Sequence, residues 1–397
     1  MKRIIDKMSG ATIGVKFSVG FVLLVFLFAT TSIFFANDVP IYTKHDEWRG
    51  FPIFKKEAYF EFIRKHPVSK PNFQINALIP FSSTTIDEKN NLAPPGTSNG
   101  QFSHLLGTDG YNRDVFAGVI YGSRVVVWVG ILSNLLAILV AIFFGSLAGY
   151  YSAKGWLLPR LNFWLFMLFE FGLLYFLLVN PYFKQVAHNT YLLVLIFILL
   201  NWMMLWLFFR LIKTDKHFIK IPVDFMVTKA IEIIQSIPGL LLLIALAAVL
   251  GGMNILKLTL LISFLRWPSL TRLVRGEVIK VKQSSFIESA QSLGLRNHQI
   301  VIRHILPNIF KQVMVAFAFG VGSSILMEAA LSFLGLGLPP DQVTWGMLLS
   351  QARVNPTAWW LAVFPGLLIS CMILSCYTLG NAISGQAKLK TSGESII

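Results

Sequence analysis

Residues 288–308 read ESAQSLGLRNHQIVIRHILPN, a polar stretch that lies between two apolar segments. The pattern predicts two short helices separated by a break. Gly294 is the expected end of the first helix, because glycine adopts the left-handed conformation of helix C-termini without steric cost. Asn297 is the expected N-cap of the second helix. Pro307 has no backbone N–H, so it is expected to interrupt that helix or to start the next one, near the point of membrane entry.

The first of these helices is expected to have an apolar side. Phe286, Ala290, Leu293 and Leu295 fall roughly on one helical face, with polar side chains around the rest. Two interpretations are open at this point. The stretch is either an amphipathic surface hairpin without a partner, or a helix whose apolar side binds another protein.

The full spacing of the stretch favours the second interpretation. It resembles the cytoplasmic loop of the membrane subunits of bacterial ABC importers, which reads E-A-A-x-x-x-G and later I-L-P. The matching residues are Glu288, Ala290, Gly294, Ile305, Leu306 and Pro307, with Ser289 in place of the middle alanine. In that family the first helix docks into a groove of the ATPase subunit and carries its motion to the pore. The resemblance therefore implies that this loop, including Phe286 and Leu293, couples the chain to an ATPase.

The composition is that of an integral membrane protein. Hydrophobic residues make up 55% of the chain and charged residues only 13%, whereas a soluble domain has about 25% charged residues. The formal net charge is +15, but the basic residues cluster beside apolar segments, as cytoplasmic anchors do. We therefore expect the lipid bilayer as a partner and no nucleic acid.

The sequence contains none of the common catalytic or metal-binding patterns. It lacks the phosphate-binding G-x-x-x-x-G-K-[ST] loop, and its seven histidines are scattered. The two cysteines, Cys371 and Cys376, lie in an apolar segment and form no metal-ligand spacing. We expect no cofactor, no metal and no enzymatic activity in this chain, with ATP hydrolysis on separate subunits.

Apolar segments and basic loops predict an all-α membrane protein with eight spans and both termini in the cytoplasm. For the first span the alternative is a cleaved signal peptide, but Phe34 occupies the −3 position of the available cut, where a small residue is needed. The expected parts are residues 1–36, a cytoplasmic N-terminus and the first span; 37–114, an extracytoplasmic segment; 115–155, core helix 2; 156–221, an inserted pair of spans; 222–385, the permease core with the coupling loop at 276–308; and 386–397, a cytoplasmic tail. The resemblance implies a type I permease core of six helices, to which the pair is added.

A second motif stands just before core helix 2. The stretch LGTDGYNRD resembles the G-T-D-x-x-G-R-D sequence of the C-type subunits of peptide and nickel importers. The matching residues are Gly107, Thr108, Asp109, Arg113 and Asp114. Asn112 replaces a glycine, although asparagine also tolerates left-handed dihedral angles. The local interpretation is a helix N-cap at Thr108 or Asp109, and both interpretations can hold together.

Three further positions are candidates for gating. Pro238 and Gly239 are expected to kink the helix over 223–250, which resembles a core helix of the family; a flexing pore helix and a simple packing kink are both open. Glu328, in EAALSFLGLGLPP, resembles a residue of the family's outer lip. Acids in a span are costly and often functional, but Glu328 and Glu170 can also be satisfied by a neighbouring helix.

The resemblance implies the C-type permease subunit of an importer of peptides or similar small solutes, of the dipeptide, oligopeptide or nickel class. The implied partners are a homologous B-type permease, two ABC ATPase subunits and an extracytoplasmic substrate-binding protein, and the location is the cell inner membrane. The alternative is a secondary, ion-coupled transporter, which predicts inverted repeats and charged relay residues. A membrane-bound enzyme would need a clustered polar constellation, and none is visible in the sequence.

Overall fold

The computed structural model describes residues 12–45, 48–66, 71–98, 103–152, 156–159 and 218–393. The expected inserted pair of spans, with Glu170, lies outside these residues. The chain divides into two compact units, Met1–Ser146 with Ile231–Ile397, and Leu147–Ala230. In the second unit, strands β6 (Trp156–Pro159) and β7 (Phe218–Ile221) pair antiparallel.

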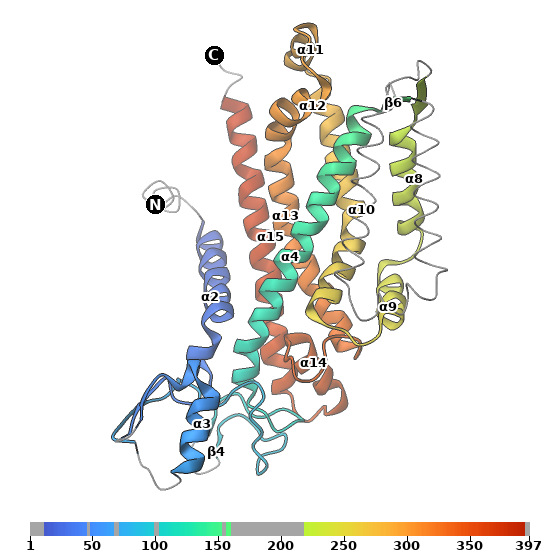
Figure 1. Cartoon of the computed structure of the whole chain (residues 1–397). Coiled ribbons are helices and arrows are strands. Elements are labelled where there is room, and N and C mark those ends of the chain that lie inside the picture. Colours follow the sequence, from blue (N-terminus) through green and yellow to red (C-terminus); the bar gives the residue numbers. More distant parts are fainter. Residues whose placement is uncertain are drawn as a thin grey trace. The chain divides into compact units, whose positions relative to one another are not determined.

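The described part of the first unit is mainly helical, as the sequence predicts. Its long helices are α2 (Ile13–Phe35), α4 (Val115–Tyr150), α10 (Ile255–Lys282), α13 (Leu306–Phe333) and α15 (Trp360–Gly393). Figure 1 shows that α4, α10 and α15 run toward one end of the bundle and that α2 and α13 run the opposite way. This alternation is the arrangement of a chain that crosses a bilayer repeatedly, and the protein is an all-α integral membrane protein.

The number of spans is lower in the described residues than in the whole-chain prediction. Four helical segments are long and apolar enough to cross a membrane, and the pair α8 (Val223–Gln235) and α9 (Gly239–Leu250) gives a fifth if it is one span. Helix α10 has 28 residues but carries charges along its length, so composition alone does not identify it as a span. Eight spans remain a prediction, because two of them lie outside the described residues.

The helix over 223–250 is broken and not merely kinked. Helices α8 and α9 meet at an angle of 82°, and residues 236–238 between them are not helical. Pro238 lacks the N–H that would continue α8, and Gly239 then starts α9. The sequence therefore predicted the position of this bend, but its sharpness is greater than the expected kink.

Shorter elements occupy the two ends of the bundle. At one end, α11 (Ser285–Ser292), α12 (Asn297–Ile300) and the π-helical turn η2 (Val301–Ile305) connect α10 to α13. At the other end lie α14 (Trp345–Val354) and the segment between α2 and α4 (Figure 1). That segment contains a three-stranded sheet, the short helices η1 and α3, and a hairpin: β1 (Tyr42–Lys44), β2 (Arg49–Gly50), η1 (Pro52–Phe54), α3 (Lys56–Lys65), β3 (Phe73–Ile75), β4 (Thr97–Ser98) and β5 (Ser103–His104).

Small residues let the long helices approach closely. At Gly145 of α4, an added Cβ would lie only 2.8 Å from the side chain of Val274 in α10. At Gly320 of α13, an added Cβ would overlap the Asn134 amide of α4, whose Nδ2 donates a hydrogen bond to Phe317 O at 2.7 Å. Lipid gives no hydrophobic driving force between helices, so close backbone contact and interhelical hydrogen bonds hold such a bundle together.

The Gly320 contact leads to a stability prediction. Gly320→Ala is expected to lower the free energy of unfolding by about 1–3 kcal/mol, because the fully buried Asn134 side chain must leave its bond to Phe317. Gly276→Ala in α10 is the matched control, since an added Cβ meets no atom within 4 Å there. It is expected to be neutral or slightly stabilising. Thermal unfolding of the purified protein in detergent measures both, and equal melting temperatures of the two variants would contradict the packing described here.

Candidate functional site

The loop between α10 and α13 contains the residues expected to contact an ATPase. Helix α11 ends at Ser292, and Gly294 has φ +76°, the left-handed conformation that the sequence predicted for it. A residue with a side chain would be strained there. The chain then turns into α12, whose N-cap position is Arg296 and not Asn297. The Arg296 N–H donates to Gln299 Oε1 at 3.1 Å, so a glutamine side chain caps the turn from within the helix.

The apolar residues of α11 divide between two sides, contrary to the single face expected from the sequence. Ile287, which the prediction left out, is fully buried, and Ala290 is 5% exposed. Phe286 and Leu293 point away from this buried side and are 45% and 81% exposed. The reason is spacing: Phe286 and Leu293 are seven residues apart, two helical turns, whereas Ala290 follows Ile287 by less than one turn. The inner side holds the loop in place and leaves the outer apolar side free.

The I-L-P sequence lies where the loop enters the long helix. Ile305 is fully buried, and Pro307 stands at the start of α13. The preceding turn is π-helical, with the Leu306 N–H bonded to Val301 O. Proline cannot donate to the turn before it, and a π turn accommodates the missing hydrogen bond without ending the helix. Pro307 therefore starts α13, and the helical path is continuous from residue 297 to residue 333.

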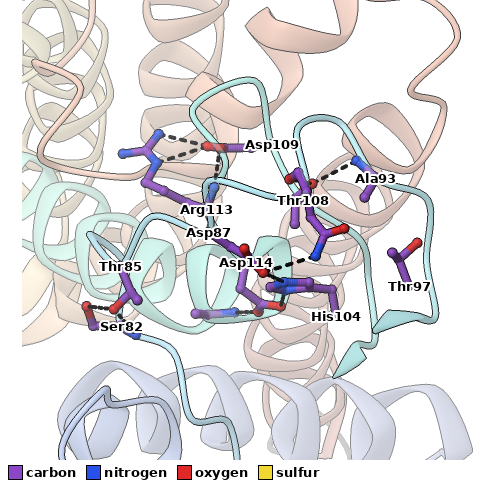
Figure 2. Close-up of polar contacts among 12 residues, drawn as sticks. Ser82, Thr85, Asp87, Ala93, Thr97, His104, Thr108, Asp109, Arg113 and Asp114 are labelled. Atoms are coloured by element: carbon purple, nitrogen blue, oxygen red, sulfur yellow. Dashed lines mark hydrogen bonds and ion pairs between the residues drawn. The ribbon is translucent and has the colours of Figure 1, made fainter. Parts of the chain in front are cut away.

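At the opposite end, the second motif forms a compact turn before α4. Asp109 Oδ1 accepts hydrogen bonds from the backbone N–H groups of Tyr111 (2.8 Å) and Arg113 (2.9 Å). Asp109 Oδ2 accepts from Arg113 Nη2 at 2.8 Å and from Nε at 3.1 Å. Asn112 has φ +59°, as its place in the motif requires. Figure 2 shows Asp109 and Arg113 facing each other across this turn, and both side chains are buried.

The N-cap of α4 is Asp114, not Thr108 or Asp109. Asp114 Oδ1 accepts the Ala117 N–H at 2.7 Å. Thr108 instead closes the loop that precedes the motif: its hydroxyl donates to Asn90 O and accepts the Ala93 N–H. Gly107 has φ +81°, and an added Cβ would lie 2.6 Å from Ala93 O, so glycine is needed at this close approach.

His104 lies between two carboxylates. Its Nδ1 is 2.8 Å from Asp114 Oδ2 and its Nε2 is 3.1 Å from Asp87 Oδ2 (Figure 2). The imidazole is fully buried and stacks on the ring of Phe81, with ring centroids 4.4 Å apart. Both ring nitrogens face carboxylate oxygens, an arrangement that favours the doubly protonated ring, which has no lone pair to offer a metal. Burial alone lowers the pKa of His104, but the hydrogen bonds and negative charges of Asp114 and Asp87 outweigh it and raise the pKa above its usual value.

The same turn is bonded to the C-terminal part of the chain. Gln351 of α14 accepts the Gly110 N–H at 2.7 Å, and its Nε2 donates to Asp109 Oδ2 at 3.2 Å. Trp360 Nε1, at the start of α15, donates to Thr108 O at 3.0 Å. Arg113 Nη1 donates to the carbonyl of Pro340. These bonds fix the first turn of α4 to α14 and α15.

The gating candidates lie apart from both motifs. Glu328 is 1% exposed, near the C-terminal end of α13, and its Oε1 accepts the Ser332 hydroxyl at 2.8 Å. Gly346 of α14 packs directly on this turn, since an added Cβ would lie 2.8 Å from Ser332 Cβ. Pro238 and Gly239 form the break between α8 and α9. The structure thus brings Glu328 next to α14 and leaves the break as a separate feature.

Sequence reasoning missed the polar residues that are distant in the chain. His104 stands three residues before Gly107, and its adjacency to the motif was the one signal that pointed to it. Asp87 and Gln351 gave no local signal, because they meet the motif only in the folded chain. Ile287 was missed because the apolar face of this helix was counted from Phe286, and Ile287 does not belong to the face counted in that way.

The His104 geometry predicts a pH dependence. A histidine whose pKa is raised on folding stabilises the fold fully below its unfolded pKa of about 6.5, and this stabilisation is lost as the pH rises through the folded pKa. Protection of residues 87–114 from hydrogen exchange is therefore expected to fall as the pH rises above about 6.5 and through the raised pKa of His104. His104→Asn is expected to remove this dependence and to cost about 3 kcal/mol, because two buried carboxylates lose their cation. The exposed His66→Asn serves as control, and a pH dependence unchanged in His104→Asn would contradict the assignment.

Comparison with known proteins gives one family match and several similar permease proteins. Residues 218–386 match the family described as "Binding-protein-dependent transport system inner membrane component". The chain is 28% identical over 282 residues to the glutathione transport system permease protein GsiD of Pectobacterium atrosepticum. The aligned region covers 71% of each chain. It is 37% identical over 171 residues to GsiD of Shigella flexneri serotype 5b, covering 43% of this chain and 56% of that protein. The chain thus spans about half the length of several of the relatives that it matches.

The matched region contains both halves of the α8–α9 break, all of α10 to α14, and most of α15. These relatives are named as transport system permease proteins, and the apolar helices agree with a multi-pass location in the inner membrane. Residues 218–386 carry the domain of the binding-protein-dependent transport system inner membrane components, and the chain is similar to transport system permease proteins.

Proposed function

We propose that this chain is the C-type permease subunit of an ABC importer for small peptides of the glutathione and dipeptide class. It pairs with a homologous B-type permease to form the pore. Two ATPase subunits bind from the cytoplasm and hydrolyse ATP, and an extracytoplasmic binding protein delivers the solute. The solute class is supported by the relatives, which are named as parts of glutathione transport systems.

The observation that carries this proposal is the exposed apolar side of α11. Phe286 and Leu293 are 45% and 81% exposed, although burial of such side chains is favourable by about 1.5–3 kcal/mol each. Polar residues surround them, and an exposed apolar patch with a polar rim is typical of a protein interaction site. A groove on an ATPase subunit is the partner that fits a helix presenting two apolar residues on one side.

The buried side of α11 supports a mechanical role. Ile287 and Ala290 fix α11 to its own chain, so a displacement of the helix is transmitted to its neighbours α10 and α12. The latter continues into α13, which reaches Glu328 at the far end of the bundle. The break at Pro238 and Gly239 supplies a place where a core helix changes direction as the pore opens to one side or the other. This is alternating access by rigid-body motion, with no chemistry in this chain.

The distribution of charge supports an orientation. Around α11 the chain carries a group of basic residues: Lys280, Lys282, Arg296 and Arg303. Basic loops face the cytoplasm in membrane proteins. Since the segment between α2 and α4 lies at the other end of the bundle (Figure 1), it is extracytoplasmic in this proposal, and both termini are cytoplasmic.

Ion-coupled secondary transport is not favoured. An ion-coupled transporter needs no exposed helix for an ATPase. In addition, residues 218–386 match a family of components of binding-protein-dependent transport systems.

The docking role predicts the effect of two substitutions on α11. Phe286→Asp combined with Leu293→Asp is expected to reduce ATPase co-purification and solute uptake at least about tenfold, because both apolar anchors are lost. Ser289→Ala is the matched control on the same helix, since it removes no apolar surface, and it is expected to leave both quantities unchanged. Gly294→Pro is expected to behave like the double variant, because proline cannot adopt φ +76°. Undiminished assembly and uptake in the aspartate variant would refute the docking role.

The orientation is tested by labelling from outside the cell. In a background without Cys371 and Cys376, Lys89→Cys is expected to react with a membrane-impermeant maleimide, because Lys89 is exposed in the outer segment. Ser285→Cys, which is equally exposed at the start of α11, is expected to react only after the membrane is permeabilised. The reverse pattern would overturn the proposed topology.

A further inference from the structure

Arg266 lies inside the helical bundle, near the middle of α10. Its neighbours one turn away on either side, Ile262 and Leu270, are both buried, so the arginine is on the inward side of the helix. Arg266 itself is only partly exposed. A charge at this depth is expensive in a membrane, and such residues face the interior of a bundle or a path for solute.

The guanidinium of Arg266 has no carboxylate partner among the described residues. Within the described residues it forms no ion pair, and its buried Nε has no hydrogen-bond partner. Arg113 is a contrasting case in this protein, because its Nε and Nη2 both donate hydrogen bonds to the carboxylate of Asp109. Leaving a buried charge unpaired is costly, so a bound anion would stabilise this position.

The surroundings of Arg266 are polar for a membrane interior. Tyr377 of α15 lies within electrostatic range of the guanidinium. Gln312 of the adjacent helix α13 has a buried amide oxygen without a partner among the described residues. Arg266 lies about 24 Å from the end of α10 at Lys282, at a rise of about 1.5 Å per residue. Gln312 lies about 22 Å from the start of the α12–α13 helix at Asn297. Both residues are therefore at a similar depth in the bundle, measured from the end that contains α11.

The broken helix is close to this site. Gln235, the last residue of α8, donates from Nε2 to the Ser269 hydroxyl at 3.1 Å. Ser269 is three residues from Arg266, less than one turn of α10. The α8–α9 break therefore stands next to the unpaired cation. In transporters, solute sites are commonly built beside discontinuous helices near the middle of the membrane.

We propose that Arg266 binds a carboxylate of the solute as the solute crosses the membrane. This inference rests on the proposed import of small peptides, and it assigns the contact that holds such a peptide inside the permease. The planar guanidinium donates two parallel hydrogen bonds to a carboxylate, a geometry that a lysine ammonium reproduces only in part. A peptide with a free carboxylate neutralises the site, whereas a peptide amide leaves the cation unpaired.

The experiment measures binding by the complete transporter in nanodiscs, without its binding protein. The probe is radiolabelled glutathione, and the competitors are unlabelled glutathione and its diamide. In the wild type, glutathione is expected to compete at least about tenfold better than the diamide. Arg266→Gln is expected to weaken glutathione binding by a similar factor and to abolish this preference, and Arg266→Lys to retain part of both. Arg272→Gln, an exposed arginine of α10 outside the coupling loop, is the control and is expected to bind like the wild type.

Stability and uptake show whether Arg266 contacts the solute or only supports the fold. Arg266→Gln removes an unpaired charge, so its melting temperature is expected to equal or exceed that of the wild type. Unchanged glutathione binding in Arg266→Gln would overturn the inference, and so would a destabilised complex in both Arg266 variants, which would make the residue structural. A wild type that imports glutathione with its binding protein, but binds none without it, would overturn the inference and leave the proposed function standing. A wild type that neither imports glutathione nor binds it would overturn both this inference and the proposed function.

Discussion

Lipid supplies no hydrogen-bond partners to a protein backbone, and this constraint accounts for the distribution of structure in the chain. The long helices satisfy their backbone groups internally, and irregular structure lies mainly at the two ends of the bundle. The exceptions inside it are few and specific among the described residues. They are the break at residues 236–238, the unpaired Arg266 and the buried Glu328. A membrane protein tolerates such features only where protein or solute can satisfy them, so these positions are where function is to be sought.

The two ends of the bundle differ in how their side chains are bonded and exposed. At the end that contains the segment between α2 and α4, buried ion pairs and hydrogen bonds fix the start of α4 to α14 and α15. At the other end, α11 keeps one side buried and presents Phe286 and Leu293 outward. A tightly bonded end and, at the opposite end, a loop with an exposed apolar side are what the proposed coupling to a partner subunit requires.

Local rules predicted local structure well. The left-handed conformations of Gly294 and Asn112, the bend at Pro238 and most helices followed from residue type and hydrophobic spacing. Contacts between distant residues did not follow. The Asp87–His104–Asp114 bridge joins a loop, a strand end and a helix cap, and nothing in the separation of Asp87 from Asp114 indicates it. The N-cap of α4 was misplaced because the prediction considered only Thr108 and Asp109. In the folded chain both of these side chains make other bonds, and Asp114 caps the helix.

The central claim is that α11 is held by a nucleotide-hydrolysing partner. A photoreactive benzophenone amino acid at position 293 tests it most directly, because Leu293 is the most exposed apolar residue of the loop. Illumination of membranes containing the complete transporter is predicted to give one adduct with the ATPase subunit, and ATP is predicted to change its yield. Adducts with lipid alone, or with the permease itself, would contradict the account.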